Sequence, residues 1–222
     1  MNPAILQLAR EVSSKLRSLD VVNAASLRAV RRELSSQLES ASSRDTINLA
    51  FQIIERAPPG AYPVMYELLA YHPTAMSALR LADLTRLGKN MSGWGEVDCF
   101  SYLAGVAWRN GQISQSDVHK WARSDNRWWR RAALVSTVPL NMKSAGGRGD
   151  ANRTLALCRL LLDDRDDMVV KAMSWALRAL ATRDPKRVEE FVEKHQNTLA
   201  RRASREVRNK LRTGRKDGRQ VV

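Results

Sequence analysis

Apolar residues recur along the chain at the three- and four-residue intervals of an α-helix. The first stripes are Ile5, Leu8, Val12 and Leu16, then Leu27, Val30, Leu34 and Leu38, then Ile47, Ala50, Phe51 and Ile54. The sequence has no alternating Val, Ile and Thr runs bounded by Asn-Gly or Asp-Gly, the pattern typical of β-hairpins. The pattern therefore predicts an all-α chain.

Glycine, proline and small polar residues interrupt these stripes at short intervals. The interruptions fall at residues 57–60, 72–73, 88, 93–95, 110–111, 124–126, 146–149 and 184–185. Short helices separated by short breaks are typical of helical hairpins and not of a long coiled coil.

One pair of segments repeats. Asp125-Asn126-Arg127 precedes an apolar segment with Arg131-Ala132-Ala133, and Arg165-Asp166-Asp167 precedes one with Lys171-Ala172-Met173, 40 residues later. The acidic openers suit helix N-caps, and the offset falls in the range of HEAT-like repeats. The sequence predicts an α-solenoid, a superhelix of HEAT-like repeats in a single domain over residues 1–213. Such solenoids commonly bind an extended partner on a concave surface.

The charge of the chain indicates a polyanionic partner. Its 37 Lys and Arg residues against 23 Asp and Glu residues give a formal net charge of +14. Nucleic acid is the first candidate, an anionic membrane the second, and a ribosome-associated or merely very soluble basic protein the remaining alternative. The sequence contains no run of about 18 apolar residues, so it predicts no membrane span. No secretory signal is visible either, and we therefore expect a cytoplasmic protein.

Metal and cofactor chemistry have little support in the sequence. Cys99 and Cys158 lie far apart, and no C-x-x-C pair exists. The three histidines, His72, His119 and His195, show no ligand spacing. We expect neither a metal nor a cofactor.

The last stretch of the chain is strongly basic. Between residues 199 and 219, nine Lys and Arg residues are opposed only by Glu206 and Asp217. Ala203, Val207 and Leu211 predict a final helix, with Arg202 and Arg205 among its phosphate-binding candidates. Residues 214–222 are predicted to be a basic, disordered tail.

Three segments combine tryptophan with charged residues, at 94–98, 124–133 and 171–178. On a helix, Trp94 and Asp98 share a face. Arginine can hold a phosphate, and an indole can pack on deoxyribose or support a cation. A carboxylate repels phosphate, so Asp98 makes more sense if it stabilises a cation that forms during a reaction.

Each of these residues also has a structural interpretation. Trp175 lies in an apolar helix, and this position taken alone predicts a buried residue of the hydrophobic core. Asp98 could cap a helix or form a salt bridge with a basic side chain, and Arg131 could pair with an acidic side chain on a neighbouring helix. Glu96 could share the role of Asp98, but two residues apart on a helix they point to different faces.

The three segments, in this order and at this spacing, resemble the AlkD family of DNA glycosylases. The matching patterns are Trp-x-x-Val-Asp at 94–98, Ser-Asp-Asn-x-Trp-x-x-Arg-Ala-Ala at 124–133, and Lys-Ala-x-x-Trp-x-Leu-Arg at 171–178. The resemblance extends over roughly residues 85–210. It implies a superhelix of HEAT-like repeats that acts on double-stranded DNA, excises cationic N3- and N7-alkylated purines and leaves the target base stacked.

The resemblance also implies roles for individual residues. Asp98 would be catalytic, with Trp94 and Trp175 cradling the deoxyribose or backbone, and Arg131 would hold a phosphate. Weaker phosphate-binding candidates from charge and position are Lys171, Arg127 and Arg130, besides Arg202 and Arg205 in the last helix. We expect a monomer without an obligate protein partner.

The N-terminal third departs from the family pattern. Residues 21–28 lack the glycine and proline of the family's corresponding segment, and Gly93 stands where a second aromatic residue often precedes the key tryptophan. The N-terminal repeats are therefore expected to hold DNA differently. Two alternatives to a glycosylase remain: a non-catalytic relative that binds branched or distorted DNA, and a helical-repeat scaffold for protein partners.

Overall fold

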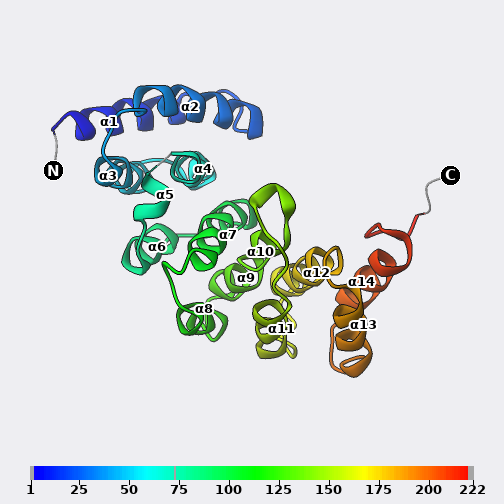
Figure 1. Cartoon of the computed structure of the whole chain (residues 1–222). Helices are drawn as coiled ribbons and strands as arrows, with labels where there is room; N and C mark the ends of the chain where they lie inside the picture. Colours follow the sequence, from blue (N-terminus) through cyan, green and yellow to red (C-terminus); the bar gives the residue numbers. More distant parts are fainter. Residues whose placement is uncertain (1–2, 73, 220–222) are drawn as a thin grey trace. The chain divides into compact units, whose positions relative to one another are not determined.

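The computed structural model describes residues 3–72 and 74–219, and all regular secondary structure in these residues is helical (Figure 1). The predicted all-α class is confirmed, and the arrangement is compatible with a helical-repeat solenoid. The chain divides into two compact units, Met1–Ile113 and Ser114–Val222. That the repeats over 1–213 act as one HEAT-like domain stays a prediction.

The first unit contains seven α-helices in its described residues and one short 3-10 helix, η1 (Pro59–Ala61). The helices are α1 (Pro3–Arg17), α2 (Ala24–Gln37), α3 (Ser43–Ile54), α4 (Pro63–Tyr71), α5 (Ala75–Ala78), α6 (Leu81–Gly88) and α7 (Trp94–Arg109). Most breaks fall where glycine and proline predict them. Residue 73, part of one predicted break, lies outside the described residues.

The helices of the first unit pack in two rows. In one row α2 packs on α4 and α4 on α7, while in the other α1 packs on α3 and α3 on α6. The predicted stripes face inward: Leu27, Val30 and Leu34 of α2 and Ile47, Ala50 and Phe51 of α3 are all buried. Burial of these stripes fixes which face of each helix remains for solvent.

The second unit begins with α8 (Gln115–Ala122) and contains one short 3-10 helix, η2 (Lys143–Ala145). Its other helices are α9 (Arg127–Val135), α10 (Val138–Asn141), α11 (Ala151–Leu160), α12 (Asp167–Ala181), α13 (Pro185–Lys194) and α14 (Arg201–Thr213). In this unit α9 packs on α12 and α12 on α14, while α11 and α13 also pack against α12. The apolar face of α12 is buried along its length.

The 40-residue offset reappears in the helix caps of this unit. The side chain of Asn126 accepts from the Trp128 amide at 2.8 Å, and that of Asp166 accepts from the Met168 amide at 2.9 Å. Both residues cap the first turn of their helices. The expected acidic opener is right for Asp166, whereas at α9 the cap is Asn126 and not its neighbour Asp125.

The chain turns back on α14 after the helix ends at Gly214, whose φ of 73° is readily adopted by glycine. Lys216 Nζ lies 3.5 Å from a Glu206 carboxylate oxygen, and Asn209 Nδ2 donates to the Lys216 carbonyl at 3.1 Å. Residues 220–222 of the predicted disordered tail lie outside the described residues, and its disorder stays a prediction. Within the described chain, every helix is too short or too polar to cross a membrane.

Candidate active site

Helix α7 begins at Trp94, and the carboxylate of Glu96 caps its first turn. Glu96 Oε2 accepts from the amides of Ser92 at 2.8 Å and Gly93 at 3.3 Å, and the Glu96 side chain is buried. A carboxylate used in this way stabilises the helix and is turned away from solvent. Glu96 is therefore a capping residue, a role that the sequence analysis did not assign to it.

The outer face of α7 carries the first group of candidate residues. Trp94, Asp98 and Tyr102 follow one another at intervals of four, so they line one face of the helix. Trp94 is 63% exposed and Tyr102 38%, and Asp98 between them is partly exposed. The face thus presents a carboxylate between two aromatic side chains, a suitable arrangement for a positively charged sugar or base.

Neighbouring helices of the first unit add charges next to this face. The negative charges of Glu67 and Asp98 act on Cys99, which follows Asp98 on α7. Glu67, on α4, lies 3.7 Å from Arg28 Nε and 3.9 Å from Arg31 Nε of α2. Glu67 is thus paired with two arginines from the adjacent helix.

The two cysteines of the chain are held as thiols. Burial, with the nearby charges of Glu67 and Asp98, raises the pKa of Cys99 to about 12, and burial raises the pKa of Cys158 to about 12. Because the thiolate is the nucleophilic form, neither side chain is suited to covalent catalysis at neutral pH. The candidate catalytic groups are therefore carboxylates and not thiols.

In the second unit, the predicted phosphate-binding residues Arg127 and Arg130 pair with acids that precede α12. Arg130 Nε lies 2.7 Å from Asp164 Oδ2, and Arg127 Nη1 lies 3.4 Å from Asp166 Oδ2. The Arg127 guanidinium also lies 5.0 Å from the centre of the Trp128 ring. These pairs tie α9 to the start of α12, and phosphate binding by either arginine stays a prediction.

Arg131 lies in the interior of the second unit. Its side chain is only 5% exposed, and Nη1 donates to the Met168 carbonyl at 2.8 Å. Met168 belongs to the first turn of α12, so this bond joins equivalent ends of two neighbouring repeats. The structure thus places the predicted phosphate-binding Arg131 between α9 and α12.

Helix α12 carries the second exposed group, Lys171, Trp175 and Arg178. These residues are spaced by four and three, so they lie on one face, and all three are partly exposed. Lys171 Nζ lies 2.6 Å from Asp167 Oδ2. This hydrogen bond, together with the positive charges of Lys171 and Arg202, lowers the pKa of Asp167.

The basic helix α14 adds Arg202 and Arg205 beside α12. Arg202 Nη1 lies 3.1 Å from Asp167 Oδ1, and Arg202 Nε donates to Glu206 Oε1 at 3.1 Å. Arg205 is exposed and makes no ion pair with any other residue that the structure describes. Of the two predicted phosphate contacts, Arg202 is held by acids and Arg205 is not.

The candidate residues fall into two groups, one in each unit. Trp94 and Asp98 share the outer face of α7 in the first unit, and Lys171, Trp175 and the predicted arginines belong to α9, α12 and α14 in the second. That the two groups act on one substrate stays a prediction. Two residues on these faces were not among the predicted site residues: Tyr102, which lies eight residues after Trp94, and Arg178, which ends the 171–178 motif three residues after Trp175.

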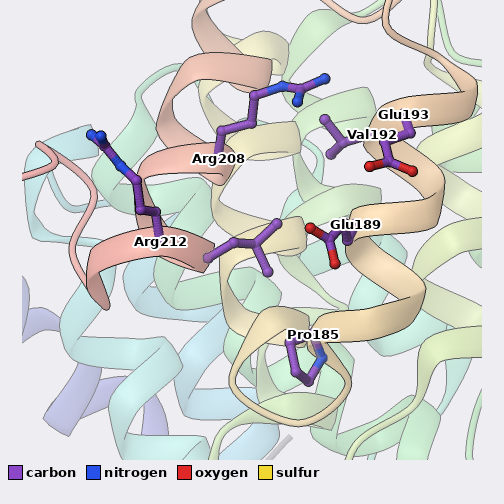
Figure 2. Close-up of a pocket in the computed structure, with 7 residues that line it drawn as sticks. Pro185, Glu189, Val192, Glu193, Arg208 and Arg212 are labelled. Carbon is purple, nitrogen blue, oxygen red and sulfur yellow. The ribbon is translucent and has the colours of Figure 1, made fainter.

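A groove of about 480 Å³ between α13 and α14 is separate from these faces (Figure 2). Its lining combines the apolar Val192 and two carboxylates of α13 with two arginines of α14. The lining residues are Pro185, Glu189, Val192, Glu193, Arg208, Leu211 and Arg212. None of the candidate catalytic residues lines it. Within the described chain, no cluster of three or more His, Cys, Asp or Glu side chains could hold a metal ion.

Comparison with known proteins defines the family of the chain. No curated protein matches the chain. The family model of the DNA alkylation repair enzymes matches residues 7–211, which include the exposed faces of both α7 and α12. The chain therefore belongs to the DNA alkylation repair enzyme family.

Proposed function

We propose that the protein is a DNA glycosylase that hydrolyses the N-glycosidic bond of cationic N3- and N7-alkylated purines in duplex DNA. The family, the net charge of +14 and the exposed face of α7 support this proposal. The observation that carries it is the contrast between two carboxylates on α7. Glu96 is used as a cap, whereas Asp98 lies on an exposed face between Trp94 and Tyr102.

The proposed reaction needs no strong general acid. An alkylated purine that carries a positive charge leaves with the electron pair of the C1′–N bond and becomes neutral. The sugar then gains oxocarbenium character, as in glycoside hydrolysis. Asp98 stabilises that charge, orients a water molecule toward C1′ and accepts its proton.

The other residues have binding roles in this proposal. Trp94 and Trp175 pack on deoxyribose, and the cations of α12 and α14 hold phosphates of the same duplex. The protein acts as a cytoplasmic monomer without a cofactor or metal.

Base release from methylated duplex DNA tests the proposal. Wild type is expected to release 3-methyladenine or 7-methylguanine, and Asp98→Asn to lose roughly a hundredfold or more in rate while still binding DNA. Glu190→Gln, which removes an exposed carboxylate on α13, is the matched control and should retain the wild-type rate. Retained turnover in Asp98→Asn would exclude the proposed mechanism.

A second candidate function is non-catalytic binding of branched or distorted DNA. The departure of residues 21–28 and of Gly93 from the family pattern motivates it, because DNA would then be held differently by the N-terminal helices. This function predicts salt-sensitive DNA binding with no base release by wild type. The same assay therefore separates the two candidates.

A further inference from the structure

A buried carboxylate lies beneath the basic face shared by α12 and α14. Glu206 of α14 is 6% exposed, and its Oε2 accepts from the Ser174 hydroxyl of α12 at 2.6 Å. Its Oε1 accepts from Arg202 Nε at 3.1 Å and lies 3.5 Å from Lys216 Nζ. The same Ser174 oxygen accepts from Arg178 Nε at 3.1 Å.

These contacts keep Glu206 ionised. Burial alone would raise its pKa, but the hydrogen bonds from Ser174 and Arg202 and the charge of Lys216 outweigh burial and lower it. A buried charge is tolerated when it is paired and hydrogen-bonded in this way. Glu206 is therefore a fixed negative centre that joins α12 to α14.

The two arginines are anchored at different numbers of nitrogen atoms. Arg178 donates through Nε to Ser174, whereas Arg202 donates through Nε to Glu206 and through Nη1 to Asp167 Oδ1 at 3.1 Å. The terminal amino groups of Arg178 make no hydrogen bond to any residue that the structure describes. Arg178 also lies on the same face of α12 as Trp175.

We propose that Glu206 is a positioning residue that, directly and through Ser174, fixes the guanidinium groups of Arg202 and Arg178 for one stretch of DNA phosphate backbone. The inference rests on the DNA-binding part of the proposed function and not on its chemistry. Arginine binds phosphate best when two donors are held in a fixed orientation. Holding the side chains before DNA arrives reduces the entropy that binding must remove.

Charge alone predicts the opposite effect of removing this carboxylate. Glu206→Gln makes the protein more positive, and long-range attraction to DNA would then increase. A positioning role instead predicts weaker binding, because Arg202 loses the charge of one of its two anchoring carboxylates, and Ser174, which anchors Arg178, loses the carboxylate that holds it. The sign of the change in affinity therefore distinguishes the two accounts.

The test uses the full chain and an unmodified duplex, with binding measured by fluorescence anisotropy over a series of salt concentrations. Glu206→Gln is expected to bind about tenfold more weakly, with the slope of log affinity against log salt reduced by about one phosphate contact. Ser174→Ala, which changes no charge, should weaken binding in the same direction through Arg178 alone. Glu190→Gln matches the charge change at an exposed site and should bind as tightly as wild type or slightly more tightly.

Circular dichroism at the assay temperature establishes that each variant is folded. If Glu206→Gln does not fold, Ser174→Ala decides the question, since it preserves the buried charge. Unchanged or tighter binding by the folded variants would overturn the positioning role. Absence of base release by wild type would overturn the proposed chemistry alone and would leave this comparison of affinities valid.

Discussion

The exposed faces of α7 and α12 each combine a tryptophan with a charged residue four positions away, but with opposite charge. On α7, Trp94 precedes Asp98, and on α12, Lys171 precedes Trp175. The α7 face is anionic and aromatic, while the cations of the α12 face are held by carboxylates beside and beneath them. In the proposed function, the α7 face would accordingly contact positive charge on the substrate and the α12 face phosphate.

The two faces also differ in how firmly their side chains are held. Lys171 is hydrogen-bonded to Asp167, and Arg178 is anchored on Ser174. Trp94 occupies the first position of its helix and is mostly exposed. A prearranged cation site together with a more open aromatic site suits binding of a constant backbone beside a variable lesion.

After Asp98→Asn, the largest effect is expected from removing either tryptophan. Trp94→Ala and Trp175→Ala should each slow single-turnover base release by about ten- to a hundredfold, through lost packing on the nucleotide. Because Trp94 is 63% exposed, its substitution should leave the melting temperature nearly unchanged. A Trp94→Ala variant with the wild-type rate would remove the α7 face from the active site.

The next effect separates the two carboxylates of α7 by stability. Glu96→Ala loses the helix cap and should lower the free energy of unfolding by about 1–2 kcal/mol in chemical denaturation. Its rate of base release, at a temperature where it is folded, should equal that of wild type. Loss of turnover in folded Glu96→Ala would show that the proposal assigns the chemistry to the wrong carboxylate.

A smaller effect should follow from the second aromatic residue of the α7 face. Tyr102→Ala is expected to weaken binding to alkylated duplex about fivefold, because a ring that packs on a base or sugar contributes at least about 1 kcal/mol. Tyr102→Phe retains the ring and is the matched control. Equal affinities for the two variants would show that the ring makes no contact with DNA.

The smallest effect concerns acid stability at the base of the α12 face. Since the pKa of Glu206 is lowered in the folded protein, its ionised form stabilises the fold above the ordinary carboxyl pKa. That contribution is lost as the pH falls through the lowered value. Thermal melts from pH 7 to pH 3 should show the difference between wild type and Glu206→Gln shrinking with acid, and a constant difference would contradict this linkage.

The sequence predicts the helices because their apolar stripes and breaks are local signals. The repeat also brings charged residues together. Arg127 and Asp166, 39 residues apart in the sequence and so close to one repeat, form an ion pair. Repeat spacing alone does not reveal how deeply a side chain is buried, and Arg131 illustrates this.

Arg131 and Arg130 are neighbours in the sequence with the same chemistry. The burial of Arg131 depends on α9 turning that residue toward α12, a property of packing and not of local pattern. Tyr102 was missed for the converse reason: an aromatic residue inside an apolar helix reads as core, and only the packed structure shows it on the surface.

The raised pKa values of the two cysteine thiols have a consequence for a protein that works on alkylated DNA. The agents that alkylate DNA also attack proteins, and a cysteine thiolate is among the most reactive targets. With pKa values raised to about 12, Cys99 and Cys158 stay almost entirely protonated at neutral pH. In this protein the surroundings of both thiols thus suppress the form that reacts with alkylating agents.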